Sequence, residues 1–331
     1  MAAPTKRMIR YTLLRALQMI PTVLLVTVVV FVLIIIIPGD PVLSMLGYYS
    51  DDVTATAVPH EVYDRMFREL RLDRPIPIQY LYWLGDALQG DFGKSVVFRV
   101  PVIDVVLSRI PATLYLGTAS LLIAIAVSVP FGVWAAVKND TWVDHLASGF
   151  VLFGVAVPGF WFGMIVILVF AIYLGWLPSI GYVPPQEDFL RFLKHLILPA
   201  TVLGLDVAAN ILRFQRTDFL DQLHQDYVRT ARAKGLPGQL VIWKHVLKNS
   251  LIATVTVVGL NTARLLGGST IIETLFSYPG LSRLLIEAIY ARDFPVIQAV
   301  VLWMVVLVVI VNFFVDLIYA YLNPRIRYTT A

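Results

Sequence analysis

Several charged and amide side chains lie within otherwise apolar stretches of this sequence. Asp206, Asn210 and Arg213 are spaced at i, i+4 and i+7, and Asn261 and Arg264 are three residues apart, so each set falls on one face of a helix. Charged groups are costly in apolar surroundings and indicate either a functional site or a satisfied interior contact. We expect Asp206, Asn210, Asn261 and Arg264 to line a polar path. The alternatives are a satisfied interior pair that only joins helices, or an arginine that snorkels outward.

The remaining chemical groups of the sequence do not assemble into a catalytic or metal-binding pattern. Asn312 and Asp316, at i and i+4 near the end of the last apolar run, favour a structural role. The five histidines are scattered and cysteine is absent, so we expect no metal site and no disulfide. The apolar runs carry no HExxH motif and no matched pair of aspartates, which argues against an intramembrane enzyme.

The elements that must position these groups are transmembrane helices. Hydrophobic residues make up 58% of the 331 residues and charged residues only 15%, against about 25% in soluble domains. A helix needs about 20 apolar residues to cross a bilayer. The sequence therefore predicts an all-α integral membrane protein with six spans, at about residues 16–37, 112–137, 146–174, 196–212, 251–272 and 296–322. Pro158-Gly159 in the third span predicts a kink there.

The distribution of lysine and arginine predicts the orientation of the spans. With the N-terminus inside, fourteen basic residues fall in inner segments and four in the two short outer loops. We therefore expect both termini in the cytoplasm. The segment 38–111 is then a large outer loop, and the segment 213–250 a cytoplasmic loop.

The inner loop 213–250 has the pattern of two helices joined by a glycine turn. Residues 217–234 show an apolar stripe at every fourth position, Gly235-Leu236-Pro237-Gly238 is a stop signal, and 239–248 predict a second short helix. Its apolar face is expected to carry Leu240, Trp243 and Leu247. The loop holds seven basic and three acidic residues. It is either an ordinary hairpin whose charge fixes topology, or a rigid knob that inserts into a cytoplasmic partner.

Residues 226–236, DYVRTARAKGL, resemble the coupling loop of ABC importer permeases, in particular of the dipeptide, oligopeptide and nickel branch. The glutamate, isoleucine and proline of the general family pattern are missing here. On this resemblance the residues that contact the ATPase are Tyr227, Arg229, Thr230, Ala231, Ala233, Lys234, Gly235 and Leu236.

Further segments are similar to the same branch and to its first-type permease subunit. They are residues 38–41 (PGDP), 90–95 (GDFGKS), 273–281 (ETLFSYPGL), 291–295 (ARDFP) and 323–328 (NPRIRY). The resemblance implies a type I importer fold in the bacterial inner membrane. It also implies a second permease subunit, two cytoplasmic ATPase subunits and an external substrate-binding protein as partners, without nucleic acid. ATP is expected to bind only the ATPases, because this chain lacks the phosphate-loop motif.

The solute that this resemblance implies is a short peptide. A zwitterion needs an acid, a base and amide partners, which Asp206, Arg264, Asn210 and Asn261 offer. Nickel chelates and glutathione-like compounds, carried by the same branch, remain alternatives. An ion-coupled secondary transporter is a different class, and the paired broken helices typical of that class are not evident.

Overall fold

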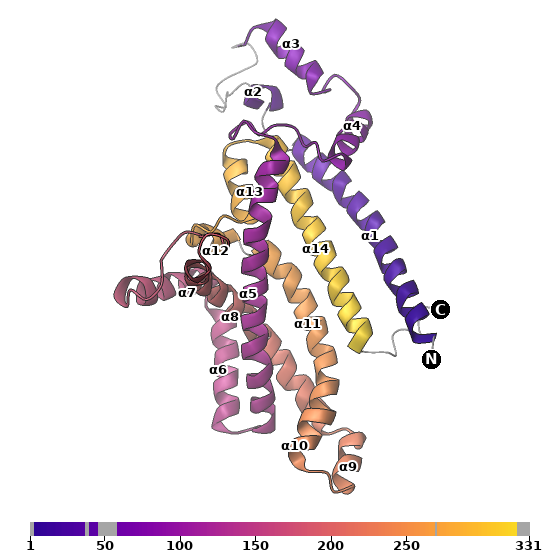
Figure 1. Cartoon of the computed structure of the whole chain (residues 1–331), viewed down its shortest axis with the longest axis vertical. Helices are drawn as coiled ribbons and strands as arrows, with labels where there is room; N and C mark the ends of the chain where they lie inside the picture. Colours follow the sequence, from indigo (N-terminus) through magenta and orange to yellow (C-terminus); the bar gives the residue numbers. More distant parts are fainter. Residues whose placement is uncertain (1–2, 37–39, 46–57, 269, 323–331) are drawn as a thin grey trace. The chain divides into compact units, whose positions relative to one another are not determined.

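The computed structural model describes residues 3–36, 40–45, 58–268 and 270–322, and most of these residues are helical. The longest connections between helices within these ranges are residues 89–101 and 174–188. The all-α prediction is confirmed: over the described ranges the backbone forms no strand, and its extended pairing is a bridge between Lys94 and Pro101. The elements in chain order (Figure 1) are α1 (Ala3–Ile36), α2 (Pro41–Met45), α3 (His60–Glu69), α4 (Ile76–Leu88), α5 (Val102–Val137), α6 (Trp142–Ala156), α7 (Gly159–Val166), η2 (Ile167–Tyr173), α8 (Phe189–Leu223), α9 (Asp226–Ala233), α10 (Gly238–Leu240), η3 (Val241–Val246), α11 (Leu247–Gly268), α12 (Thr270–Leu275), α13 (Leu281–Tyr290) and α14 (Phe294–Leu322).

The described helices agree with a six-span protein. Four of them, α1, α5, α8 and α14, are long and apolar enough to cross a membrane, and two bent pairs raise the number to six if each pair is one span. The expected spans 16–37, 112–137, 196–212 and 296–322 fall on α1, α5, α8 and α14, except that residue 37 lies outside the described residues. The expected span 251–272 falls on α11 and α12, and residue 269 between them is not described.

The third span is broken, which goes beyond the kink that the sequence predicts. The axis of the α7–η2 segment is turned by 105° from that of α6. Val157 adopts an extended conformation (φ −90°, ψ 123°) and Pro158 follows at φ −61°, ψ 130°. A residue before proline is pushed out of the helical region, and proline itself has no N–H to donate, so the helix ends and a new one starts at Gly159.

The chain divides into two compact units. Unit 1 comprises residues 1–15, 114–278 and 310–331, and unit 2 comprises 16–113 and 279–309.

Helix α8 is the centre of unit 1 and contacts α6, α7, α11 and α12. Of its most apolar 18-residue window, 67% is buried, against 39% for α5 and for α14. A helix enclosed by other helices does not face lipid and tolerates polar residues. This explains why α8, with a mean hydropathy of 1.6, is the least apolar of the four long helices α1, α5, α8 and α14.

Small residues let the neighbours of α8 approach closely. A Cβ added at Gly154 of α6 would lie 2.4 Å from the Cβ of Ala209, and one at Gly204 of α8 would lie 2.7 Å from the carbonyl oxygen of Ser120 in α5. Neither position accepts a larger side chain without moving a backbone. Such small-residue contacts are typical of helix packing in membranes.

In unit 2, aromatic side chains hold α4 against α1. The ring of Phe31 lies 5.6 Å from that of Tyr80 and 5.8 Å from that of Trp83, measured between centroids. The hydroxyls of Thr27 and Tyr80 share a hydrogen bond of 2.8 Å. The segment 38–111 is therefore partly folded, and not a plain loop.

Asp40 joins two short helices of unit 2. One carboxylate oxygen accepts the backbone N–H of Val42 at 2.8 Å in the first turn of α2, and the other accepts the hydroxyl of Tyr63 in α3 at 2.8 Å. Burial, followed by the hydrogen bond to Asp40, raises the pKa of Tyr63 above its ordinary value. Residues 38 and 39 of the PGDP motif lie outside the described residues.

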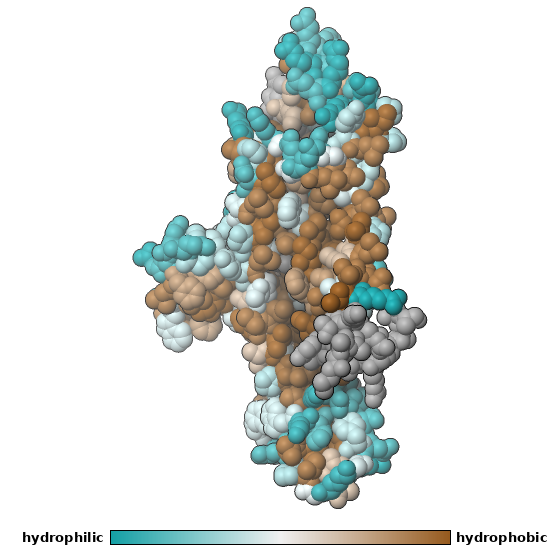
Figure 2. Space-filling view, turned by 45° about the vertical axis from the view of Figure 1, so that its right-hand side comes forward, coloured by the Kyte–Doolittle hydropathy of each residue, from teal (hydrophilic) through white to brown (hydrophobic). Residues whose placement is uncertain are grey.

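Apolar side chains cover the surfaces of the long helices. On α1, Leu17, Leu25 and Ile36 are more than half exposed. Figure 2 shows hydrophobic residues over the long helices, and hydrophilic residues around α3 in unit 2 and around α9 in unit 1. An apolar helical surface of this kind matches a lipid environment.

Candidate functional site

The segment after α8 forms a compact projection, which we call the knob and define as residues 226–246. Its core is a buried apolar cluster in which Val228 and Ala231 of α9 meet Val241 and Val246 of η3. Phe219 of α8, fully buried, and Val133 and Ala136 of α5 complete the cluster. The knob is thus packed onto the ends of two long helices, α5 and α8.

The predicted single helix 217–234 is wrong, because the chain breaks at His224 and Gln225 into α8 and α9. In one continuous helix, Phe219 and Ala231 would be about 18 Å apart at 1.5 Å per residue. The break lets α9 fold back so that both residues enter one cluster. His224 and Asp226, which are poor helix formers, flank the break.

The predicted second helix, 239–248, is also different in the structure. It does not end at Lys248, because α10, η3 and α11 follow one another without a gap from Gly238 to Gly268. Its buried residues are Val241 and Val246, while Leu240 and Trp243 of the expected apolar face are 41% and 59% exposed. In a π-helix, residues five apart share a face, and this register replaces the 3.6-residue period that the prediction assumes.

Gly235 ends α9 in the way that the sequence predicts for a helix stop. The N–H of Gly235 donates to the carbonyl of Arg232 at 2.9 Å, and the N–H of Leu236 donates to that of Ala231 at 3.3 Å, which is the Schellman arrangement. Gly235 has φ +74°, a conformation that disfavours residues with a side chain. A Cβ added there would have no atom within 4 Å, so this position favours glycine for its backbone conformation and not because neighbouring atoms crowd it.

Most of the predicted ATPase-contacting residues are at the surface of the knob. Arg229, Thr230, Ala233, Lys234 and Gly235 are exposed. Tyr227 and Leu236 are partly buried, and Ala231 belongs to the core.

Two adjacent side chains of α8 fix the helices beneath the knob. Arg216 donates from Nη2 to Asp144 of α6 at 2.7 Å and to the side-chain oxygen of Asn139 at 3.0 Å, and its Nε also donates to Asp144. Gln215, fully buried, donates to the hydroxyl of Ser250 at 3.0 Å and accepts from that of Thr254, both in α11. Sequence analysis misses these residues, since their partners are 35 to 77 positions away.

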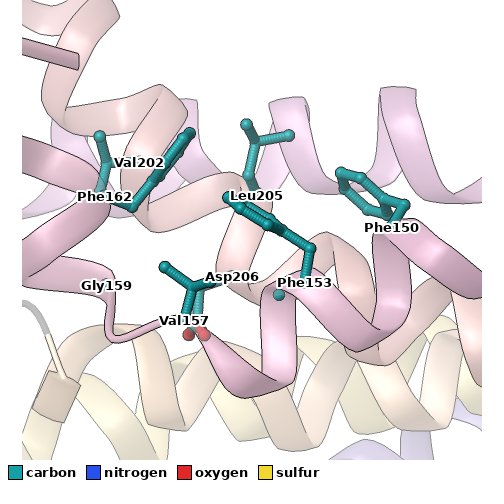
Figure 3. A pocket seen from close by; sticks show the side chains of 9 residues that line it. Phe150, Phe153, Val157, Gly159, Phe162, Val202, Leu205 and Asp206 are labelled. Carbon is teal, nitrogen blue, oxygen red and sulfur yellow. The ribbon is translucent and has the colours of Figure 1, made fainter. Parts of the chain in front are cut away.

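Asp206 lines a pocket where α6, α7 and α8 meet (Figure 3). The other lining residues are apolar, among them Phe150, Phe153, Phe162 and, at the helix break, Val157 (Figure 3). Asn210 lies one turn further along α8, and its amide donates to the backbone carbonyl of Asp206 at 3.4 Å.

The other path candidates lie on α11, which packs along α8. The amide of Asn261 donates to the carbonyl of Val257 in its own helix at 2.8 Å. The side chain of Arg264 lies outside the described residues. Asp316 of α14 forms an ion pair with Arg15 at 3.2 Å, a structural contact of the kind that we expect for it.

The described residues contain no group of three or more histidine, aspartate or glutamate side chains placed to hold a metal ion.

Comparison with known proteins places this architecture in a family. Residues 128–328 match the family described as binding-protein-dependent transport system inner membrane component, and residues 8–117 match its N-terminal membrane component. The chain is similar to the glutathione transport system permease protein GsiC of Escherichia coli strain K12, of Salmonella typhimurium strain LT2 and of Shigella dysenteriae serotype 1. Identity is 40% over 321 residues in each case, covering 97% of this chain and all of the relative.

The membership confirms the predicted type I fold, multi-pass placement in the inner membrane and role in transport. A permease of such a system works with a partner permease, an ATPase and a binding protein. This chain belongs to the permease family of binding-protein-dependent ABC importers.

Proposed function

We propose that this chain is one of two different permease subunits that together form the translocation path of an importer for short peptides. The knob is the observation that supports a cytoplasmic ATPase as partner, because it is a compact projection with a buried core and an exposed basic surface. Each permease holds one cytoplasmic ATPase through such a knob, and ATP binds the two ATPases and not this chain. This is the role of a transport component and not of an enzyme.

The orientation that supports this arrangement has both termini and the knob in the cytoplasm. The 14-to-4 excess of basic residues in the inner segments supports it. The segment 38–111 then faces outward, toward the binding protein. The C-terminal residues 323–331 lie outside the described residues, so this part of the proposal rests on the sequence.

The path is proposed to use the polar face of α8 and α11, with Asp206, Asn210, Asn261 and Arg264. The carboxylate of Asp206 opens onto a pocket at the broken third span, where a passing ammonium group would find one acidic partner among apolar walls. Weak, mixed contacts suit a path that must release its solute.

A glutathione-like solute is the second candidate, and the relatives named as glutathione permeases favour it. Glutathione is a tripeptide with a free amine, so both candidates share the chemistry of a peptide zwitterion. Nickel chelates are the third possibility within the same class of importer.

Reconstitution of the whole transporter separates these candidates. The two permeases, both ATPases and the cognate binding protein are placed in vesicles, and ATP-dependent uptake of labelled di- to pentapeptides, glutathione and nickel with chelators is measured. Peptide uptake supports the proposal, and uptake of glutathione alone assigns the second candidate. Nickel uptake without any peptide uptake overturns the proposal that the solute is a short peptide.

A further inference from the structure

A second recess lies within unit 2. We call it the groove. It has a volume of about 560 Å³ and is lined by parts of α1, α2, α3 and α4, by the start of α14, and by residues 70–72, 91–93 and 96. Ligand pockets in proteins typically measure about 300–1,000 Å³ and combine apolar walls with a few polar groups.

Two sequence motifs that neither the knob nor the path explains meet at this groove. Residues 91–93 of the GDFGKS motif and residues 294–295 of the ARDFP motif line it. They are held together by Asp293, whose carboxylate accepts the hydroxyl of Ser95 at 2.5 Å and the N–H of Val97 at 3.2 Å. Asp293 and Ser95 are almost fully buried, so this wall of the groove is rigid.

The charges of the groove are unequal. Glu69, Asp86 and Asp91 provide three carboxylates, against one guanidinium from Arg71. Arg71 donates to Asp86 at 2.9 Å and lies over the ring of Tyr82, 4.4 Å from its centroid. Both partners of this ion pair are more than 40% exposed, so separating them for a ligand costs little.

The apolar wall is aromatic. Phe31 and Trp83 form one ring pair, and Tyr82 carries the stacked guanidinium. The side-chain amides of Gln79 and Gln298 complete the lining. A ligand with an ammonium group, a carboxylate, an amide and an apolar side chain matches all four features.

We propose that the groove binds the transported short peptide before it enters the membrane. The ammonium group of the peptide lies among Glu69, Asp86 and Asp91, its carboxylate meets Arg71, and an apolar side chain packs on Trp83. The excess of carboxylates disfavours an anionic phospholipid, whose phosphate would be repelled. This inference rests on the proposed function and orientation, because it takes the imported solute as the ligand and the groove as outward-facing.

The test uses the complete transporter in nanodiscs without binding protein. The probe is radiolabelled glycyl-p-azidophenylalanine, and irradiation followed by mass spectrometry locates the modified residues. Labelling is expected within residues 76–96, with unlabelled alanyl-phenylalanine as competitor. N-acetylation of the probe removes its ammonium group and should reduce labelling about tenfold, the ratio that corresponds to 1.4 kcal/mol.

Two variants and a matched control sharpen the test. Asp86→Asn keeps the shape of the side chain but removes its charge, and Tyr82→Leu removes the ring under Arg71; each should lower labelling about tenfold. Arg74→Met is the control, because Arg74 lies, like Arg71, on the connection between α3 and α4. It is outside the groove and forms an exposed ion pair with Asp73. It should label as the wild type does.

The outcomes separate the groove from the proposed function. Three results would overturn the inference. They are labelling confined to other parts of the chain, equal labelling by the acetylated probe, and competition by a phospholipid but not by the peptide. If the wild type imports peptides while the groove stays unlabelled, the groove assignment fails and the function stands. If the groove is labelled but peptides are not imported with ATP, the proposed function fails and the binding site stands.

Discussion

Arg216 and Asp144 form a two-pronged ion pair between α8 and α6, with both guanidinium prongs directed at the two carboxylate oxygens. The side chain of Asp144 is 5% exposed and that of Arg216 is 26% exposed. Asp144 also accepts the backbone N–H of Asp140 at 3.1 Å, so the same carboxylate fixes the turn between α5 and α6. Three helix ends next to the knob are thereby held in one arrangement.

Loss of Arg216 should destabilise unit 1 more than loss of Asp144. Arg216→Met leaves a buried carboxylate without its cation, for which the cost is about 3–5 kcal/mol. Asp144→Asn leaves a guanidinium that reaches water, so the cost should be smaller. Melting temperatures of the purified permease pair, followed by tryptophan fluorescence, measure the difference.

Arg191→Met is the matched control for this prediction. Arg191 lies on the same helix in an exposed ion pair with Asp188, and exposed pairs contribute about 0–1 kcal/mol. If Arg216→Met melts at the same temperature as Arg191→Met, the buried pair has no stabilising role.

The long apolar runs allow the spans to be placed from the sequence, because a membrane helix needs continuous apolar residues and few other structures do. The ends are less predictable: α8 begins at Phe189 and continues to Leu223, well beyond the expected 196–212. Its first and last turns carry charged residues, among them Arg191, Lys194, Asp218 and Asp221. A hydropathy criterion therefore misses them.

The knob shows where the reasoning from periodicity fails. Gly235 is found at the expected helix stop, because the need for a positive φ is local and is visible in the residue type. The break at His224 and the π-helical register of η3 depend on which residues must meet in the core, a tertiary requirement that one sequence does not display. The same limit hides the contacts of Gln215 and Asp293.

Removing the hydroxyl of Ser95 should loosen the wall of the groove. Ser95→Ala takes away the 2.5 Å hydrogen bond to buried Asp293 and the acceptor of the N–H of Phe98. Asp293 still accepts the N–H of Val97, so the cost is that of one lost hydrogen bond to a charged group, about 1.5–3 kcal/mol. Faster hydrogen–deuterium exchange is expected across residues 93–102, with little change elsewhere.

Lys94→Ala provides the comparison for Ser95→Ala, because Lys94 is the adjacent residue and is exposed. Its pairing with Pro101 is a backbone contact, which the substitution keeps. It should leave exchange of the segment close to that of the wild type. Equal exchange in the two variants would contradict the role given to Ser95.

The proposed orientation predicts which introduced cysteines are accessible from outside. The chain has no native cysteine, so each introduced thiol is a single reporter. Gln186→Cys and His60→Cys should react with an impermeant maleimide added to intact cells, and Gln239→Cys in the knob should react only after lysis. All three side chains are exposed, so accessibility reflects the side of the membrane. Labelling of Gln239→Cys in intact cells, with the other two protected, would reverse the topology.

The conformation of Gly235 should control coupling to the ATPase. Gly235→Val forces a β-branched residue into φ +74°, where even an ordinary residue costs about 1–2 kcal/mol, and the chain must re-form the end of α9. Gly235→Asn should be milder, because asparagine adopts this conformation more readily. Gly238→Ala, in a position with open space around it and helical backbone, should behave as the wild type.

The readouts are the amount of ATPase that co-purifies with the permease pair and the number of solute molecules imported per ATP hydrolysed. Both should fall in the order wild type, Gly235→Asn, Gly235→Val, while membrane insertion stays constant. Normal transport by Gly235→Val would show that this turn does not position a coupling surface, and the knob would then be no more than a cytoplasmic hairpin whose charge sets topology.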